Sequence, residues 1–227
     1  MHATQPNMPG HRLLARTATT DCPIGLHQRG PRYVITACSN VLMSNDDTGS
    51  ERALGRVTAA LVRGTPRPRV LVGGLGMGFT LRALLDGLPR DARVMVIELL
   101  PAVARWNEER LGHLSQHPTH DRRVDLRIGD VAQMARGRPM WDAIVLDVDN
   151  GPEWMVQKRN GALYGSAGLN RLMRSLRPRG ALVLWSADRH PGFERRVARM
   201  RLGIRRVQER TRSGQAMGPA LYVIRDW

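Results

Sequence analysis

Short apolar runs alternate with amphipathic segments through most of the chain. From Arg69 onward, runs typical of strands recur at residues 70–72, 93–97, 124–128, 143–146 and 181–185. Apolar residues at helical spacing lie between several of these runs, over residues 80–88, 101–110 and 166–176. Strands and helices alternate in this way when a parallel sheet is covered by helices on both faces. The pattern predicts an α/β fold, a Rossmann-like sandwich with a mostly parallel sheet.

The N-terminal residues follow a different pattern. Residues 1 to about 20 are polar and contain proline, so we expect them to be loosely structured. Residues 32–37 and 41–43 are two short β-rich runs, which predict a small β-hairpin. A helix is then expected from about Ser50 to Gly64, because Thr48-Gly-Ser-Glu51 has the spacing of a capping box.

The C-terminal residues also depart from the alternation. Residues 204–211 and 220–225 are β-rich runs with no helical segment between them. They predict an antiparallel hairpin at the edge of the sheet. We therefore expect an N-terminal tail, hairpin and helix over residues 1–64, and a Rossmann-like catalytic domain over residues 65–227.

A glycine-rich loop stands between the first predicted strand and its helix, with Gly74, Gly76 and Gly78 at alternate positions. Glycines in that place let the backbone approach a ligand closely at a helix N-terminus. A dinucleotide-binding loop would need a third glycine where Phe79 stands, and an ATP-binding loop would need lysine there. The loop favours an adenosyl sulfonium ligand, which has no phosphates.

Acidic residues end the strands that follow this loop. Glu98 ends the second strand and could accept hydrogen bonds from both hydroxyls of a ribose. Asp130 follows the third strand and could accept one from an exocyclic amine, and Asp147 follows the fourth. Ligands of open α/β sheets bind beyond the carboxyl ends of the strands, where these acids are expected.

Several segments resemble the spermidine synthase family. Residues 70–82, VLVGGLGMGFTLR, resemble its donor-binding loop, and residues 94–101 and 124–130 resemble its next two strand motifs. Residues 147–152, DVDNGP, stand where the family has Asp-Ser-x-Asp-Pro, so the likeness extends over nearly the whole chain. The resemblance implies a methyltransferase-type fold and a transferase that uses S-adenosylmethionine or decarboxylated S-adenosylmethionine as co-substrate. It also implies aminopropyl transfer to a small-molecule amine, no metal, and a homodimer.

The resemblance assigns roles residue by residue. The donor would be bound by Gly74, Gly76, Met77, Gly78, Glu98, Asp130 and Asp147. Met77 stands where the family has the aspartate that holds the donor's amine, and Asn150 where it has a second, polyamine-binding aspartate. The family's Tyr-His-Glu substrate segment has no counterpart here. Substrate contacts are expected from Asn150, Trp154 and Tyr164, although Tyr164 could simply pack in the core.

Asp147 is the candidate catalytic base. The chemistry is nucleophilic displacement at a carbon attached to a positively charged sulfur, and an ammonium group cannot attack. A carboxylate must therefore accept its proton, and it can also stabilise the positive charge that builds on the nitrogen. Asp149 could share or replace this role, or it could only organise the turn at Asn150-Gly151.

Two other functions remain open from the sequence. One is an S-adenosylmethionine-dependent methyltransferase that acts on a small molecule or on RNA. The other is a non-catalytic module that binds an adenosyl ligand, for which Met77 and Asn150 are the support. Aminopropyl transfer yields methylthioadenosine and methyl transfer yields adenosylhomocysteine, so the products distinguish the two reactions.

Arginine dominates the charge of the chain. Lysine and arginine total 35 against 20 acids, a net charge of +15, and Lys158 is the only lysine. Much of the excess lies in residues 171–212, where Phe193 is the only Phe or Tyr. A nucleic-acid platform would need exposed aromatic side chains for base stacking. We therefore favour a solvated arginine-rich face over a nucleic-acid partner.

Composition also bears on compartment and on metals. Cys22 and Cys38 form no disulfide framework, and the sequence contains neither a signal-peptide pattern nor a membrane-length apolar run. We expect a cytoplasmic protein with no membrane association. Histidines stand close together at His113, His117 and His120, but Pro118 interrupts a helix there, which favours a solvated loop over a metal site.

Overall fold

The chain divides into two compact units in a computed structural model that describes residues 8–17, 23–37, 40–135, 138–148, 161–207 and 219–226. The units are residues 1–48 and 49–227. Helix α1 (Gly49–Leu61) groups with the second unit, whereas the expected boundary at residue 64 put it with the first. It does so because it packs closely on helix α2 (Phe79–Gly87): a Cβ added at Gly55 would lie 2.5 Å from the Thr80 carbonyl oxygen.

The first unit is a four-stranded antiparallel sheet in the order β1-β2-β3-β4. Its strands are β1 (Arg12–Thr17), β2 (Ile24–Arg29), β3 (Arg32–Ala37) and β4 (Asn40–Ser44). The predicted hairpin is confirmed as the β3–β4 pair, in which Ala37 lies opposite Asn40. The expectation of a loose N-terminus is wrong over β1, because that segment pairs along β2 and its backbone groups join the ladder.

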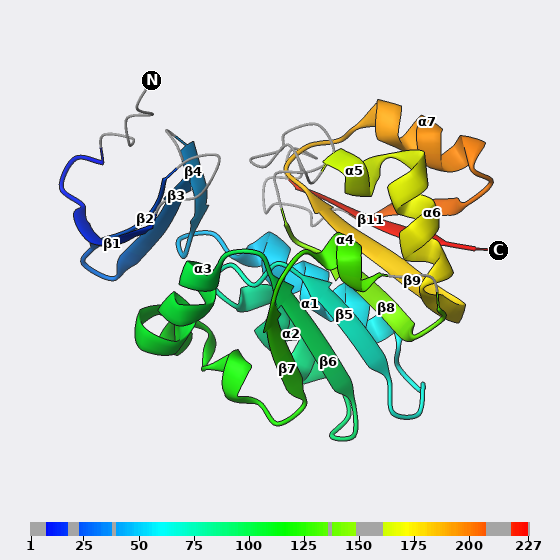
Figure 1. Ribbon diagram of the computed structural model, residues 1–227, viewed down its shortest axis with the longest axis horizontal. Coiled ribbons are helices and arrows are strands. Elements are labelled where there is room, and N and C mark those ends of the chain that lie inside the picture. The colour runs from blue at the N-terminus through cyan, green and yellow to red at the C-terminus, as the bar shows by residue number, and fades with distance from the viewer. Residues whose placement is uncertain are drawn as a thin grey trace. The chain divides into compact units, whose positions relative to one another are not determined.

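The second unit is built on a seven-stranded sheet in the order β10-β11-β9-β8-β5-β6-β7 (Figure 1). Its strands are β5 (Arg69–Gly73), β6 (Arg93–Glu98), β7 (Val124–Ile128), β8 (Trp141–Leu146), β9 (Leu176–Ser186), β10 (Gly203–Val207) and β11 (Ala220–Arg225). Strands β5 to β9 pair in parallel, and β10 and β11 add an antiparallel hairpin. The predicted Rossmann-like, mostly parallel sheet and its C-terminal hairpin are confirmed. The part of that hairpin between residues 208 and 218 lies outside the described residues.

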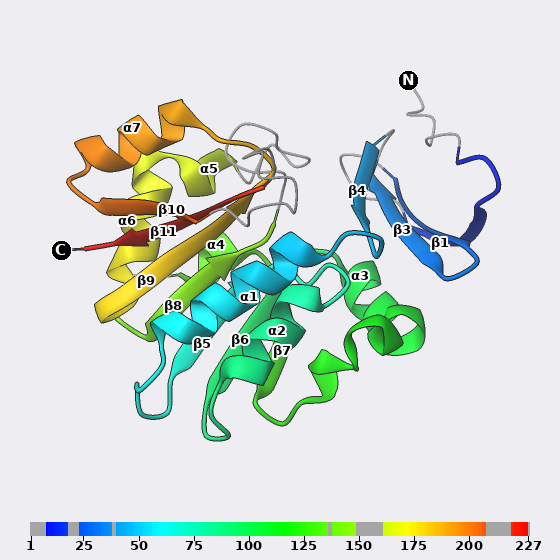
Figure 2. The ribbon, with the colours of Figure 1, turned by 180° about the vertical axis from the view of Figure 1, so that it is seen from behind.

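Helices cover both faces of this sheet. Figure 2 shows α1 and α2 on one face. The other face, toward the viewer in Figure 1, carries α4 (Val131–Met134), α5 (Gly161–Tyr164) and α6 (Ser166–Arg174), and α7 (Pro191–Arg199) packs into the same core. Adjacent residues of β5 alternate between the two cores, since Val70 and Val72 pack with α1 and α2 while Leu71 packs with the opposite cluster. No described helix is long and apolar enough to cross a membrane.

Two local predictions need correction. The helix expected over residues 166–176 ends at Arg174, and the strand expected over residues 181–185 begins earlier, at Leu176. This extension contains a bulge in β9: Leu176 pairs with Trp141 and Ala181 with Ala143, and Arg179 between them has a φ of 66°. The helix expected over residues 101–110 is α3 (Pro101–Trp106) followed by a π-helical turn, Asn107–Leu111.

Candidate functional site

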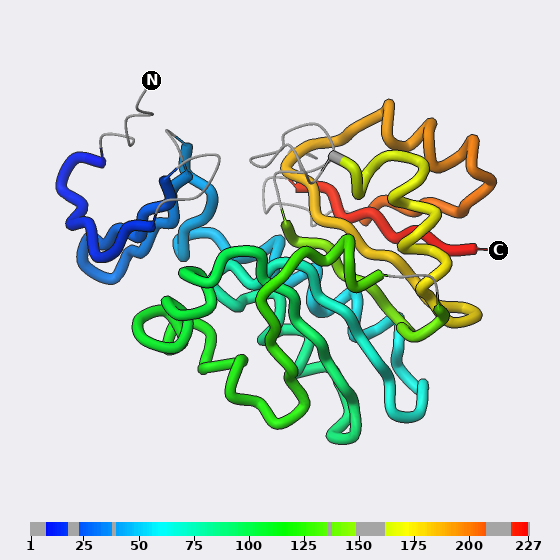
Figure 3. Tube along the Cα trace, in the orientation of Figure 1, coloured from blue at the N-terminus to red at the C-terminus, as the bar shows by residue number. Residues whose placement is uncertain are grey.

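The carboxyl ends of β8, β5, β6 and β7 lie next to one another in the sheet. The course of the chain through these strands can be followed in the Cα trace of Figure 3. Backbone hydrogen bonds extend the ladder past the strand ends. Gly74 N–H donates to the Ile97 carbonyl at 2.9 Å, and Asp147 N–H donates to the Gly73 carbonyl at 2.9 Å. The glycine loop, Glu98 and Asp147 therefore occupy one edge of the sheet, as the sequence predicted.

The loop requires glycine for steric reasons. Gly74, Gly76 and Gly78 have φ angles of 90°, 53° and 82°, which L side chains rarely adopt. A Cβ at Gly74 would lie 2.1 Å from the Asp147 carbonyl oxygen. The loop backbone is thus packed directly against the chain that carries Asp147.

Glu98 joins the glycine loop to the following helix. Its side chain is only 6% exposed, and its two oxygens accept hydrogen bonds from Leu75 N–H at 2.9 Å and Leu100 N–H at 2.8 Å. Burial raises the pKa of Glu98, and these backbone donors oppose that rise. A carboxylate has about four acceptor sites. Backbone groups of Gly76 and Leu99 also interact with Glu98, so its carboxylate is held by the glycine loop on one side and by the start of α3 on the other.

Asp147 is a second acid of this edge whose pKa is raised. Its Oδ2 accepts a hydrogen bond from the Thr80 hydroxyl at 2.7 Å. Loss of hydration, together with the charges of Glu51 and Glu98, raises the pKa of Asp147 to about 7, although the Thr80 hydrogen bond opposes the rise. A carboxyl group with a pKa near 7 exchanges protons readily at neutral pH, as a general base must.

Sequence reasoning missed Glu51 and Thr80. Glu51 stands in the first turn of α1, where a helix dipole favours an acid, so its pattern indicated only a helix start. The structure shows it 9% exposed, accepting from the Ser50 hydroxyl at 2.7 Å, and close enough to act on Asp147. We call Glu51, Glu98 and Asp147 the acidic trio.

A polar segment after α3 fixes the backbone of the glycine loop. The Asn107 amide donates to the Gly76 carbonyl at 2.7 Å, and the Ser115 hydroxyl donates to the Met77 carbonyl at 2.8 Å. Met77 itself is fully buried. Asn107 and Ser115 were not found from the sequence, since they are 31 and 38 residues away from their partners and match no motif.

The remaining candidates are placed differently. Asp130 caps α4, where its Oδ1 accepts from Ala132 N–H at 2.8 Å. Tyr164 is 2% exposed and packs edge-on against Phe193, with the ring centroids 6.3 Å apart. The residues outside the described part of the chain are Asp149, Asn150 and Trp154. Among the described side chains, no three His, Cys, Asp or Glu residues are grouped as metal ligands would be.

These features define an α/β domain of the Rossmann-like, methyltransferase type with an acidic site at the carboxyl edge of its sheet. No protein-family model and no curated protein matches the chain. Among solved structures, it is similar to the spermidine synthase of Thermotoga maritima, with a TM-score of 0.70 and 16% identity over 94% of this chain and 72% of that one. A probable spermidine synthase of Corynebacterium glutamicum has a TM-score of 0.65 and 16% identity, over 97% of this chain and 81% of that one.

A third structure is a spermidine synthase in complex with the transition-state analogue AdoDATO, with a TM-score of 0.69, 16% identity, and coverage of 94% of this chain and 72% of that one. The fold of this protein is therefore spermidine synthase-like. At this identity the likeness establishes the fold, and the chemistry has to be argued from the residues at the site.

Proposed function

We propose that this protein is a transferase that moves an aminopropyl group from decarboxylated S-adenosylmethionine to a small-molecule amine. The observation that carries the proposal is Asp147, a carboxyl group with a pKa of about 7 at the carboxyl edge of the sheet. It stands beside a glycine loop whose sequence disfavours phosphate-bearing nucleotides. The likeness to a spermidine synthase solved with AdoDATO supports the same class of ligand.

The acidic trio fits a cationic ligand. Glu51 and Glu98 are buried, Asp147 is half-buried, and the pKa values of Glu98 and Asp147 are raised. A sulfonium or ammonium group placed among them would offset the mutual repulsion of the acids, whereas a phosphate would add to it. In the proposed complex Glu98 accepts from the ribose hydroxyls and Asp130 from the adenine amine.

The proposed chemical step is a displacement on carbon. The neutral nitrogen of the acceptor forms a bond to the aminopropyl carbon, the carbon–sulfur bond breaks, and its electron pair leaves on sulfur. The carboxylate of Asp147 supplies this neutral nitrogen by first accepting a proton from the acceptor's ammonium group, and the product leaves as a secondary ammonium. Thr80 orients that carboxylate by donating to Oδ2, which leaves Oδ1 for the proton.

Methyl transfer from S-adenosylmethionine is the second candidate. Met77 favours it, because this buried apolar side chain stands where the resemblance places a carboxylate for the amine of the decarboxylated donor. Methyl transfer would leave adenosylhomocysteine instead of methylthioadenosine.

The test combines binding and product analysis. Calorimetry with S-adenosylmethionine, its decarboxylated form and their two thioether products establishes whether an adenosyl ligand binds. Incubation of each donor with a panel of di- and polyamines, followed by mass spectrometry, should yield methylthioadenosine. Adenosylhomocysteine alone would assign methyl transfer, and failure of all four ligands to bind would overturn the proposal.

Substitution of the proposed base tests its role, and the same substitution at an exposed aspartate provides the matched control. Asp147→Asn keeps an acceptor for Thr80 but removes the proton acceptor, so turnover should fall by about 100-fold or more. Asp188→Asn makes the same change at an exposed position and should leave turnover unchanged. If both variants match the wild type, Asp147 is not the base and a non-catalytic binding module is the better interpretation.

A further inference from the structure

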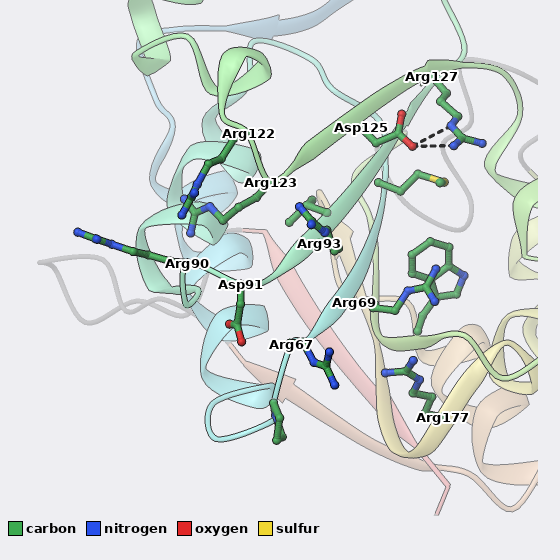
Figure 4. Close-up of a pocket in the computed structure, with 14 residues that line it drawn as sticks. Arg67, Arg69, Arg90, Asp91, Arg93, Arg122, Arg123, Asp125, Arg127 and Arg177 are labelled. Carbon is green, nitrogen blue, oxygen red and sulfur yellow. Dashed lines mark hydrogen bonds and ion pairs between the residues drawn. The ribbon is translucent and has the colours of Figure 1, made fainter.

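A hollow lies toward the opposite edge of the same sheet, where the parallel strands begin. The loops that lead into β5, β6 and β7 come together at this amino edge (Figure 3). They border a cavity of about 920 Å³ that is lined by eight arginines and two aspartates. We call this cavity the arginine groove (Figure 4).

Four of these arginines have acidic or aromatic partners. Arg123 pairs with Asp121 at 2.7 Å, Arg127 with Asp125 at 2.7 Å and Arg177 with Asp142 at 3.0 Å. The guanidinium of Arg69 lies over the Trp141 ring, 5.4 Å from its centroid. These contacts fix the wall of the groove, and the ion pairs neutralise part of its charge.

The other four arginines are Arg67, Arg90, Arg93 and Arg122, and all are exposed. Within the described ranges, none of them forms an ion pair. Clustered cations without counter-charges repel one another, which costs folding free energy unless an anion binds among them. The groove is therefore built to receive negative charge.

The arrangement favours a linear polyanion over a single phosphate group. Figure 4 shows the guanidinium groups spread around the groove instead of converging on one point. The lining runs from Arg177 on β9 to Arg127 on β7, across the starts of β8, β5 and β6. With about 4.8 Å between neighbouring strands, this row spans roughly 19 Å. Several successive charges of a chain can lie along it.

The apolar lining argues against a protein partner. Protein interfaces usually have an apolar core of well-packed anchor residues. Here Val94 and Trp141 line the groove but are only 1% and 3% exposed, and the accessible apolar lining is limited to Pro66 and the half-buried Met95. Interfaces with nucleic acid are more polar and much more positively charged.

We propose that the arginine groove binds the phosphate backbone of a nucleic acid, without reading its sequence. Trp141 is covered and bears Arg69, so within the groove it cannot stack on bases, and the contacts must go to phosphates. The exposed arginines Arg67, Arg90, Arg93 and Arg122 lie where the strands begin, whereas Glu98 and Asp147 lie where they end. The proposal therefore does not depend on the transferase function, and the bound strand is not assigned as an acceptor.

Binding to fluorescein-labelled RNA of about 20 nucleotides, single-stranded and duplex, tests the proposal over about 50–200 mM salt. Four phosphate contacts predict a slope of log affinity against log salt near −3 for the single strand. The triple variant Arg90→Ala, Arg93→Ala, Arg122→Ala should bind about 100-fold more weakly at 0.1 M salt and flatten the slope to about −1.

The matched control removes three exposed arginines elsewhere. Arg171→Ala, Arg195→Ala, Arg199→Ala changes the net charge equally on α6 and α7 and should bind RNA nearly as the wild type does. Equal losses in both triple variants, or no loss in the groove variant, would overturn the proposal. A polyglutamate peptide that binds the groove more tightly than RNA at equal charge would assign it to an acidic protein instead. Thermal melting of each variant verifies that it is folded.

Discussion

Asp147 is the titrating group on which the proposed chemistry of the site depends. A carboxyl group whose pKa is raised from 3.8 to about 7 is costly to ionise in the folded state. The cause is partly its loss of hydration and partly the charges of Glu51 and Glu98. The same features would make it a base at neutral pH and a point of instability when no cation is bound.

Stability should therefore depend on pH through Asp147. Since its folded pKa lies above its unfolded value, the folded state loses stability as pH rises from about 4 to about 7. Asp147→Asn removes this loss, so the variant should be more stable than the wild type at pH 8, by at most about 4 kcal/mol. The advantage should vanish near pH 3. Urea unfolding at a series of pH values measures it, and a pH-independent difference would contradict the assignment.

Gly74 makes a steric prediction at the same scale. Gly74→Ala forces a Cβ against the Asp147 carbonyl oxygen, 2.1 Å away, at a φ of 90°. We expect a loss of about 2 kcal/mol or more in the free energy of unfolding. Gly129→Ala, with no atom within 4 Å of the added Cβ, should change it by less than about 0.5 kcal/mol. Denaturant midpoints compare the two, and equal effects would show that the loop is not tightly packed.

At the scale of elements, the site depends on a segment that is not part of the sheet. The π-helical turn after α3 and the short 3-10 turn that follows it (Gly112–Ser115) present Asn107 and Ser115 to the glycine loop. These contacts hold two backbone carbonyls of the glycine loop. The glycines of the loop have no side chains that could anchor it. The π turn thus has a positioning role, as π turns near functional sites often do.

Asn107 should therefore affect ligand binding as well as folding. Asn107→Ala loses two hydrogen bonds, to the Gly76 and Val103 carbonyls. We expect this to lower the free energy of unfolding by about 1–3 kcal/mol. The freed loop should also weaken donor binding by about tenfold, measured by calorimetry well below the melting temperature. Asn170→Ala, at an exposed site on α6, should change neither quantity. A loss of stability with unchanged affinity would reduce Asn107 to a folding role.

At the scale of the molecule, one sheet separates two regions of opposite charge. The acidic trio lies at its carboxyl edge, and the exposed arginines of the groove, Arg67, Arg90, Arg93 and Arg122, lie at its amino edge. A strand of five residues, such as β5, separates the edges by about 17 Å. Salt at physiological concentration screens charges beyond about 8 Å, so the two regions should act independently.

Independence can be measured directly. The groove variant Arg90→Ala, Arg93→Ala, Arg122→Ala should bind the adenosyl donor within about twofold of the wild type at 0.15 M salt. Calorimetry of donor binding provides the value, and the donor-binding defect of Asn107→Ala serves as the positive control. A tenfold loss in the groove variant would mean that the two edges are coupled.

The local sequence pattern was sufficient to predict most helices and strands and to place the residues of the main motifs. Gly74, Glu98 and Asp147 were placed correctly because each follows a strand, and parallel strands bring their carboxyl ends together. Glu51 and Asn107 were not found, since long-range packing brings them to the site and their local patterns indicate ordinary helix residues. The strand at Arg12–Thr17 was missed for a similar reason, as its pairing with β2 outweighs its polar composition.

The sequence by itself determined the α/β alternation, the glycine loop and the acids at the strand ends. These follow from periodicity and from residue types that act through their immediate neighbours. Only the tertiary structure showed that Glu51 joins Glu98 and Asp147, that Asn107 and Ser115 position the glycine loop, and that arginines gather at the amino edge. The sequence located the excess charge in residues 171–212, yet the exposed arginines of the groove come from three separate segments at the starts of β5, β6 and β7. Charge acts through space, and strand order sets which distant residues become neighbours.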